Sequence, residues 1–291
     1  MISNDMMLDV TSATGLNDKT LVAATLHLPD DMSDGQLQLV FALHGGGYSR
    51  LYWHPTFADE SYSFARWFTD HGKAVLTVDM LGMGESSRPE PEDCLSRNII
   101  AAAHADALAQ VVAKLEQPVG VTGIGHSMGG MMIIAQAANH SGLDRIAVLG
   151  WANEPMELGD TNVETLLSDL PASGYIPTAR EPMRKLFYWP DVPLKLIEAD
   201  EAHASTTPVT LGKDALKPGI VHEAAAQITL PVLIVQSVVD TSPSPQKEIS
   251  YFKTASSVEL QTLENAAHCQ NFASTRATHW NDLNSWIDRT S

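Results

Sequence analysis

The sequence predicts an α/β protein with a mostly parallel central sheet, helices on both faces of that sheet and a helical insertion in its second half. Two patterns carry this prediction. Short apolar runs rich in β-branched residues recur along the chain, and helical patterns separate them. Buried parallel strands are apolar on both faces, and strand–helix alternation at this spacing is typical of a parallel sheet.

Five runs predict buried strands, at residues 37–43, 74–78, 119–124, 145–149 and 231–235. An earlier run at 21–28 predicts an antiparallel strand at the sheet edge, and residues 258–263 predict a late strand. Helical patterns cover residues 61–71, 98–116, 128–140 and 277–286. In the second of these, apolar residues form a broad stripe at helical spacing, which is typical of a helix packed on a sheet.

The strand–helix alternation stops between residues 155 and 227. Prolines interrupt a helical and loop-like pattern there, and no strong strand is predicted. With 291 residues, the chain is long enough for one domain with an insertion. We therefore expect a core made of residues 1–154 and 228–291, and a helical cap made of residues 155–227.

Composition and charge exclude several classes of partner. The chain has 35 acidic and 18 basic residues, for a net charge of −17, and the basic residues do not cluster. Nucleic acid and anionic membranes would be repelled. The start of the chain lacks the pattern of a secretory signal, and Cys94 and Cys269 match no metal-ligand spacing. These features predict a cytoplasmic protein without a membrane span.

A candidate nucleophile lies in the sequence Gly125-His126-Ser127-Met128-Gly129, which matches G-x-S-x-G. The pattern alone is weak, but here a predicted buried strand precedes it and an apolar helix follows. A serine on such a tight strand-to-helix turn projects its hydroxyl above the sheet. The alternative is a glycine-rich turn with a serine that caps the helix.

A serine hydroxyl needs an adjacent base, and the base needs an orienting group. Asp240 follows the predicted strand at 231–235, and His268 follows the strand at 258–263. The order Ser, acid, His is the order of α/β-hydrolase triads, and ligands bind beyond the carboxyl ends of parallel strands. Glu154, after the strand at 145–149, is the rival acid, and we favour Asp240.

Acyl transfer also needs N–H donors for the oxyanion. The predicted strand at 37–43 opens into His44-Gly45-Gly46-Gly47. Glycines allow a backbone to turn its N–H groups inward, so the expected donors are the N–H groups of Gly46 and Met128. His44 is expected to brace the loop. A phosphate-binding loop is excluded because the Lys-Ser/Thr of a Walker motif is missing.

These residues together resemble the α/β-hydrolase superfamily over nearly the whole chain. The segment 79–86, Asp-Met-Leu-Gly-Met-Gly-Glu-Ser, is similar to a structural loop of that superfamily, and the insertion lies where the superfamily carries its cap. The resemblance implies a lid over the site. Epoxide hydrolases and haloalkane dehalogenases carry aspartate where this chain has Ser127, so their alkyl-enzyme chemistry is disfavoured.

The expected function is hydrolysis of a carboxylic ester or lactone through an acyl-enzyme on Ser127, with no cofactor or metal. Three alternatives stay open: C–C bond hydrolysis by the same triad, a cofactor-free lyase or oxygenase, and a receptor that keeps the hydrolase pocket. The substrate is expected to be a small hydrophobic or aromatic ester, and the oligomeric state is left open. The residues expected to line its pocket are Tyr48, Trp53, Met131, Tyr188 and Trp189.

Overall fold

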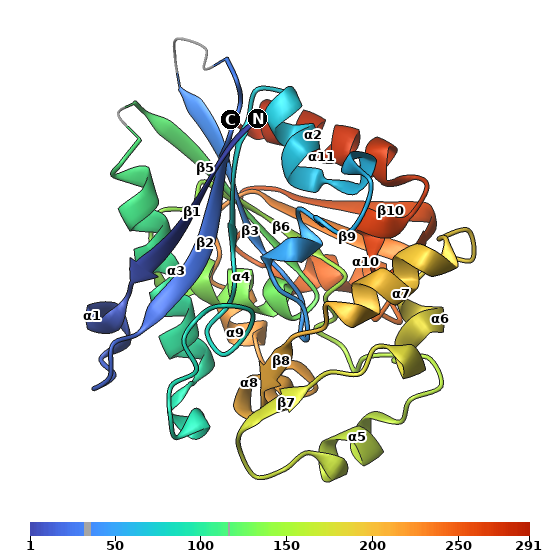
Figure 1. Ribbon diagram of the computed structural model, residues 1–291. Coiled ribbons are helices and arrows are strands. Elements are labelled where there is room, and N and C mark those ends of the chain that lie inside the picture. Colours follow the sequence, from blue (N-terminus) through green and yellow to red (C-terminus); the bar gives the residue numbers. More distant parts are fainter. Residues whose placement is uncertain (32–35, 116) are drawn as a thin grey trace.

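The computed structural model describes residues 1–31, 36–115 and 117–291. Its centre is an eight-stranded sheet in the order β1-β2-β4-β3-β5-β6-β9-β10 (Figure 1). From β4 to β10 all neighbouring strands pair in parallel, whereas β2 runs antiparallel to β1 and to β4. The predicted fold class, a mostly parallel sheet flanked by helices, is confirmed.

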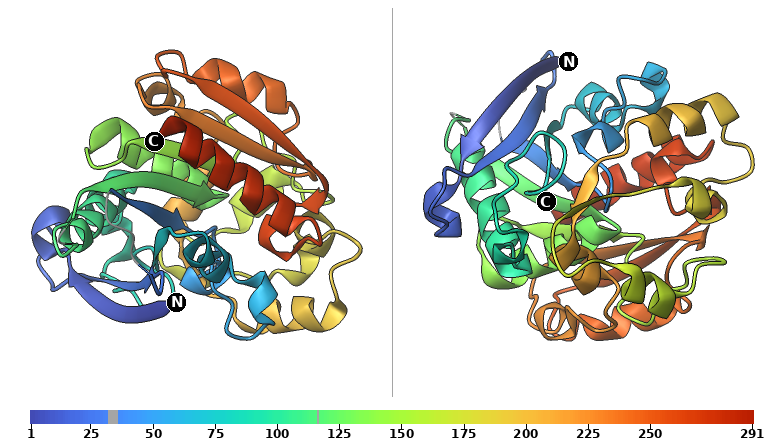
Figure 2. Two further views of the ribbon diagram at one scale, coloured as in Figure 1. Left: turned by 90° about the horizontal axis from the view of Figure 1, so that it is seen from above. Right: turned by 60° about the horizontal axis from the view of Figure 1, so that its bottom comes forward.

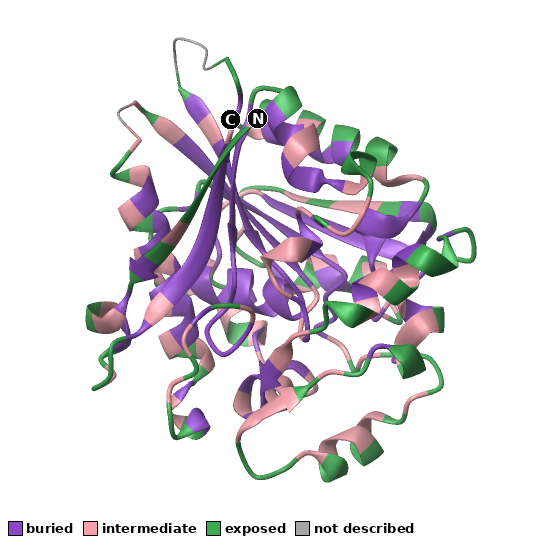
Figure 3. Ribbon diagram, viewed as in Figure 1, coloured by how far each residue is buried: buried purple, intermediate pink, exposed green. Residues whose placement is uncertain are grey.

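Several strands have the bounds that the sequence predicts, and others extend beyond them. The strands of the large sheet are β1 (Ile2–Asp9), β2 (Leu21–Leu28), β3 (Leu37–Leu43), β4 (Ala74–Val78), β5 (Val119–His126), β6 (Arg145–Leu149), β9 (Val232–Val239) and β10 (Val258–Ala267). The edge position expected for residues 21–28 is wrong, because β1 pairs along the whole outer side of β2. Most of β1 is exposed, so its sequence lacks the apolar pattern of a buried strand (Figure 3).

The helices of the core are α1 (Thr11–Thr14), α2 (Phe64–Asp70), α3 (Arg97–Val112), α4 (Met128–Asn139), α10 (Pro245–Glu248) and α11 (Arg276–Thr290). The longer ones, α2, α3, α4 and α11, lie where the sequence predicts helical patterns, whereas the four-residue helices α1 and α10 are not predicted. The helix predicted at 98–116 ends earlier, at Val112, and residue 116 lies outside the described residues. Short 3-10 turns lie at 50–52, 60–62, 92–94, 181–183, 249–251 and 270–272.

Helices cover both faces of the sheet (Figure 2). The helices α3 and α4 pack on one face, and α2 and α11 pack on the other. Alternate residues of β3 serve the two layers: Leu39 and Phe41 belong to one apolar cluster, and Val40 and Ala42 to the other. This period of two explains why the strand is apolar throughout.

The segment between β6 and β9 forms short helices and one small sheet, drawn in olive to gold in Figure 1. Its elements are α5 (Val163–Asp169), β7 (Tyr175–Pro177), α6 (Arg184–Phe187), α7 (Leu194–Ala202), β8 (Thr206–Pro208), α8 (Val209–Ala215) and α9 (His222–Ala225). The sequence does not predict the strands β7 and β8, which are three residues long and pair antiparallel. The division of the chain at residues 155 and 227 stays a prediction.

Within the described ranges, none of the helices combines the length and the apolar character needed to cross a bilayer.

Candidate active site

Ser127 lies on the tight turn between β5 and α4. Its backbone angles are φ 56° and ψ −122°, a region that non-glycine residues occupy only when the surrounding structure enforces it. Two hydrogen bonds hold the turn: the Ser127 N–H donates to the Leu149 carbonyl at 2.7 Å, and the Ser127 carbonyl accepts from the Gly130 N–H at 2.7 Å. The serine is half-buried at the end of a fully buried strand.

The glycines around Ser127 are required by close backbone contacts. A Cβ atom on Gly125 would lie 2.0 Å from the Gly129 carbonyl oxygen, and one on Gly129 would lie 2.4 Å from the Leu43 carbonyl oxygen. No side chain fits at either position. Glycine therefore allows α4 to begin directly beneath the ends of β3 and β5.

His268 and Asp240 form a buried pair. The distance from His268 Nδ1 to Asp240 Oδ1 is 2.6 Å, and the two side chains are 3% and 2% exposed. The backbone N–H groups of Ser237 and Thr241 donate to the Asp240 carboxylate at 2.8 and 2.9 Å. The carboxylate accepts both of these hydrogen bonds, and it also accepts one from the Nδ1–H of His268. The lone pair of Nε2 is then left to act as a base.

The rival acid, Glu154, contacts a different partner. Its carboxylate forms an ion pair with Lys247 Nζ at 2.7 Å. The structure therefore brings Asp240, and not Glu154, to His268.

Ser127 and His268 line the same cavity. Leu149 and Gly150 lie between the two residues. The Leu149 carbonyl accepts from the Ser127 N–H, and Gly150 packs on the imidazole of His268. Gly150 has a φ of 61°, and a Cβ atom there would lie 3.0 Å from His268 Nδ1 and 3.2 Å from Asp240 Oδ1. A side chain at this position would combine a left-handed backbone conformation with tight contacts to the imidazole and the carboxylate, so glycine is favoured.

His126, the residue before Ser127, is a further part of the site that the sequence analysis did not single out. Its Nε2 bonds to the His268 carbonyl at 2.8 Å. Burial lowers the pKa of His126 well below its ordinary value, so the ring is neutral and its Nε2–H is the donor. The turn that carries the serine is thereby tied to the loop that carries the imidazole. In the sequence, the only indication of this role is that His126 lies inside the G-x-S-x-G pattern.

The glycine loop at residues 44–47 lies against the serine turn. A Cβ atom on Gly45 would be 3.1 Å from Ser127 Cβ, and one on Gly46 would be 2.9 Å from Met128 Cε. Gly46, Ser127 and Met128 all line the cavity. The structure thus places Gly46 and Met128, the two residues expected to supply the oxyanion donors, in the wall of the cavity that holds the serine.

His44 connects this loop to the next one. Its Nδ1 bonds to the Gly45 carbonyl at 2.8 Å, and its Nε2 accepts from the Met80 N–H at 3.2 Å. Burial lowers the pKa of His44, so the neutral ring can donate on one side and accept on the other. These contacts have the bracing geometry expected from the sequence.

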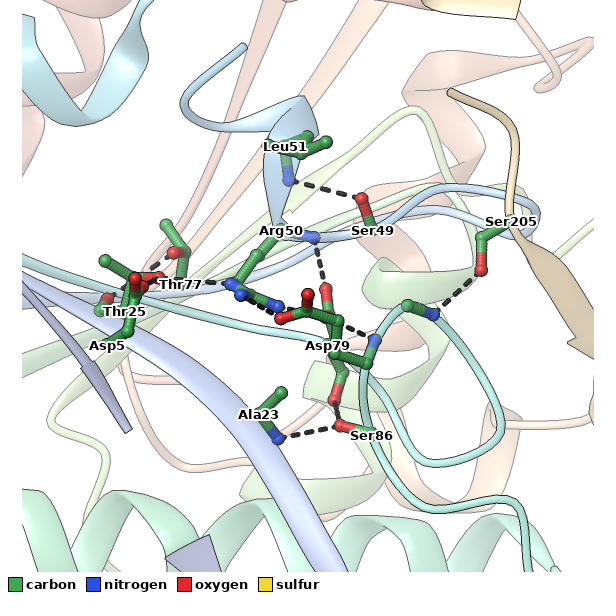
Figure 4. A network of polar contacts seen from close by, with 12 residues as sticks. Asp5, Ala23, Thr25, Ser49, Arg50, Leu51, Thr77, Asp79, Ser86 and Ser205 are labelled. Carbon is green, nitrogen blue, oxygen red and sulfur yellow. Dashed lines mark hydrogen bonds and ion pairs between the residues drawn. The ribbon is translucent and has the colours of Figure 1, made fainter. Parts of the chain in front are cut away.

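The loop at residues 79–86 forms a separate polar network (Figure 4). The Asp79 carboxylate accepts from the Arg50 backbone N–H at 2.6 Å and also pairs with the Arg50 guanidinium. Ser86 Oγ donates to the Asp79 carbonyl at 2.6 Å and accepts from the Ala23 N–H at 2.9 Å. The network joins β2 and the end of β4 to the start of the first 3-10 turn, and Ser127 is not one of its members.

The cavity has a volume of about 200 Å³ and a largely apolar wall. Its apolar lining residues are Trp151, Met156, Leu158, Leu166, Leu170, Ile176, Met183, Leu186, Phe187, Ala215 and Leu216. All of these residues lie between β6 and β9, and all except Trp151 lie within residues 155–227. The threonines Thr178, Thr207 and Thr241 add hydroxyl groups.

The five residues expected to line the pocket lie elsewhere. Trp53 and Met131 are fully buried in the two apolar clusters, and Trp189 packs on one of them. Tyr48 and Tyr188 are buried with their hydroxyl groups directed at Asp200. The lining that the structure shows consists mainly of aliphatic and methionine side chains of the insertion. An apolar residue in a sequence does not reveal whether it faces the core or a cavity.

A larger hollow of about 830 Å³ lies beside this cavity. It shares Met156, Leu158 and Leu186 with the cavity, and Asp240 contributes to its wall. Ser127 and His268 do not line it, so the smaller cavity is the candidate site. Among the residues that the structure describes, there is no group of three or more His, Cys, Asp or Glu side chains that could bind a metal ion.

Comparison with known proteins agrees with this fold. A family model described as "Alpha/beta hydrolase family" matches residues 39–278. The chain belongs to this family. No curated protein matches the sequence.

The fold of this alpha/beta hydrolase is similar to many solved structures. One is a carboxyl esterase from Bacillus coagulans, with 17% identity, a TM-score of 0.69 and coverage of 100% of this chain and 99% of that chain. An esterase from Exiguobacterium antarcticum has 20% identity, a TM-score of 0.68 and coverage of 94% and 97%. A proline iminopeptidase from Mycobacterium smegmatis has 16% identity, a TM-score of 0.67 and coverage of 99% and 98%. At these identities the likeness shows the fold alone.

Proposed function

We propose that this alpha/beta hydrolase is a serine esterase that cleaves carboxylic esters, lactones among them. The observation that carries the proposal is the meeting of Ser127, on its strained turn, and the buried His268–Asp240 pair at one apolar cavity. A serine, a base and an orienting carboxylate are the groups that nucleophilic acyl transfer needs.

In the proposed reaction, Ser127 Oγ attacks the ester carbonyl while His268 Nε2 takes the hydroxyl proton. Asp240 holds the imidazole by its Nδ1–H and stabilises the positive charge that develops on the ring. The N–H groups of Gly46 and Met128 donate to the oxyanion. His268 then gives its proton to the departing alkoxide, and a water molecule, activated by the same base, releases the acid from Ser127.

The cavity supports an apolar acyl group as the recognised part of the substrate. Its wall is mostly aliphatic, and about 200 Å³ is small for a drug-sized ligand. A short to medium acyl chain therefore fits the proposal better than a large polar one.

The test is a substrate panel measured with the wild-type protein and with Ser127→Ala. We expect turnover of p-nitrophenyl butyrate and a loss on the order of 10⁶ in kcat for the variant, since the nucleophile supplies most of the rate. A β-diketone in the same panel reports C–C bond hydrolysis. Ester turnover that persists unchanged in Ser127→Ala, or cleavage of the diketone alone, would contradict the proposal.

A further inference from the structure

The glycine loop is held from the side of the insertion as well as from the core. The Gly47 N–H donates to Thr207 Oγ1 at 2.8 Å. The Gly47 carbonyl accepts from Arg180 Nη2 at 2.7 Å and from the Ser205 N–H at 2.8 Å. Both polar groups of this backbone residue are therefore bonded to the segment between β6 and β9.

The insertion also packs directly on Gly47. The φ of Gly47 is 69°, and a Cβ atom there would lie 2.4 Å from Thr178 Cβ. Glycine both permits this backbone conformation and leaves room for the contact.

A buried ion pair fixes the position of Arg180. Its Nη1 lies 2.6 Å from Asp200 Oδ2, and the two side chains are 1% and 2% exposed. The same carboxylate oxygen accepts from the Tyr48 hydroxyl at 2.9 Å and the Tyr188 hydroxyl at 2.5 Å. The guanidinium also lies over the Tyr48 ring, 3.5 Å from its centroid. Because its charge is paired with Asp200 and both of its terminal nitrogens are hydrogen-bonded, the guanidinium is held in place against the Gly47 carbonyl.

Gly46 lies between two peptide groups that are both held by hydrogen bonds. The Gly45 carbonyl bonds to His44 Nδ1 and accepts from the Tyr48 N–H. A trans peptide is planar, so the Gly46 N–H points away from that carbonyl. The core thus holds the peptide before Gly46, and Thr207 holds the peptide after it.

We propose that Thr207 and Arg180 are positioning residues that set the oxyanion-donating geometry of Gly46. This inference rests on the proposed esterase function and extends it: the insertion completes the oxyanion hole in addition to covering the cavity. A donor must lie within hydrogen-bonding distance of the oxyanion to lower the barrier. Loss of the Thr207 hydroxyl should therefore affect the transition state more than the bound ester.

The test compares Thr207→Val, Thr207→Ser and Thr206→Val in the full chain. Valine replaces the hydroxyl with a methyl group, so it removes the acceptor for the Gly47 N–H and the contact with Thr178 Oγ1 at 3.0 Å, whereas serine keeps the hydroxyl. Thr206 is the matched control, because its hydroxyl joins the same strand to the Gly82 carbonyl at 3.0 Å, away from the glycine loop. For p-nitrophenyl butyrate we expect Thr207→Val to lower kcat about tenfold to hundredfold, less than loss of a whole donor, with little change in KM. Thr207→Ser and Thr206→Val should stay near wild type.

Binding of n-butylboronic acid gives a second readout, since its tetrahedral serine adduct places an oxygen where the oxyanion forms. Its affinity should fall in parallel with kcat in Thr207→Val. If that variant does not fold, Arg180→Lys is measured in the same way, because lysine lacks the fork that joins Asp200 to Gly47. Wild-type kcat and boronate affinity in the variant measured, or an equal loss in Thr206→Val, would overturn the inference. An inactive Ser127→Ala would show that the esterase proposal still stands.

Discussion

Among the single residues of the site, Asp240 has a carboxylate whose contacts fix the orientation of His268. Its carboxylate accepts two backbone N–H groups and faces the imidazole Nδ1 of His268. That arrangement selects the tautomer in which Nε2 is free to accept a proton.

Asp240→Asn is expected to lower kcat by about 10⁴, because an amide favours the wrong imidazole tautomer while it preserves the shape of the site. Glu154→Gln is the control, since Glu154 pairs with Lys247 instead. The measurement is the initial rate of ester hydrolysis for both variants. Equal rates for Asp240→Asn and wild type would show that Asp240 is not the carboxylate that orients His268.

The residues of the candidate triad could be proposed from the sequence because each one lies shortly after a predicted strand and because their order along the chain is Ser, Asp, His. The order of the strands then brings these loops to one edge of the sheet. The supports of the glycine loop could not be proposed in this way. Arg180 lies just before a short 3-10 turn and Thr207 lies in the three-residue strand β8, so neither belongs to a periodic pattern. Their partners, Asp200 and Gly47, are identified only by tertiary contacts.

At the scale of elements, the approach of α4 to β3 and β5 determines where the serine lies. A side chain on Gly129 would collide with the backbone of β3, as the 2.4 Å contact shows. In α8, by contrast, a Cβ atom on Gly212 would meet nothing closer than Thr207 Cγ2 at 3.8 Å.

These two helical glycines are expected to respond to alanine in opposite ways. Gly129→Ala should lower the unfolding temperature strongly because the backbones must separate. Gly212→Ala should raise the free energy of unfolding by about 0.5–1 kcal/mol, the helix propensity difference between the two residues. Thermal unfolding followed by circular dichroism measures both. Similar melting temperatures for Gly129→Ala and wild type would contradict the close packing.

The elements that the sequence predicts well are those with a buried, regular pattern. The runs that became β3, β4 and β6 are apolar on both faces, and their predicted and observed bounds coincide. The edge strand β1 is exposed and polar, and β7 and β8 are too short to show a period. Their formation depends on pairing with neighbouring strands, which local sequence does not specify.

At the scale of the whole molecule, buried neutral histidines make stability depend on pH. Burial lowers the pKa of His104 to about 3, and that of His27 and His279 to about 4. An unfolded histidine titrates near 6.5. Between these values the unfolded chain binds more protons, so the stability present above pH 6.5 is lost as the pH falls.

We therefore expect the free energy of unfolding to decrease from pH 6.5 to pH 5, by up to about 1.4 kcal/mol per pH unit for each such histidine. Urea unfolding across this range measures the slope, and His104→Leu should reduce it by about one proton. An unchanged slope in His104→Leu would show that this ring does not contribute.

The central claim is that Ser127 is the nucleophile at a site formed by three distant loops. The most direct measurement is peptide mass mapping after treatment with a fluorophosphonate, which modifies an activated serine. We expect one phosphonyl group on the peptide that contains Ser127, loss of esterase activity in proportion to labelling, and no label in Ser127→Ala. Labelling of another residue with the same loss of activity, or full ester turnover by a protein labelled at Ser127, would contradict it.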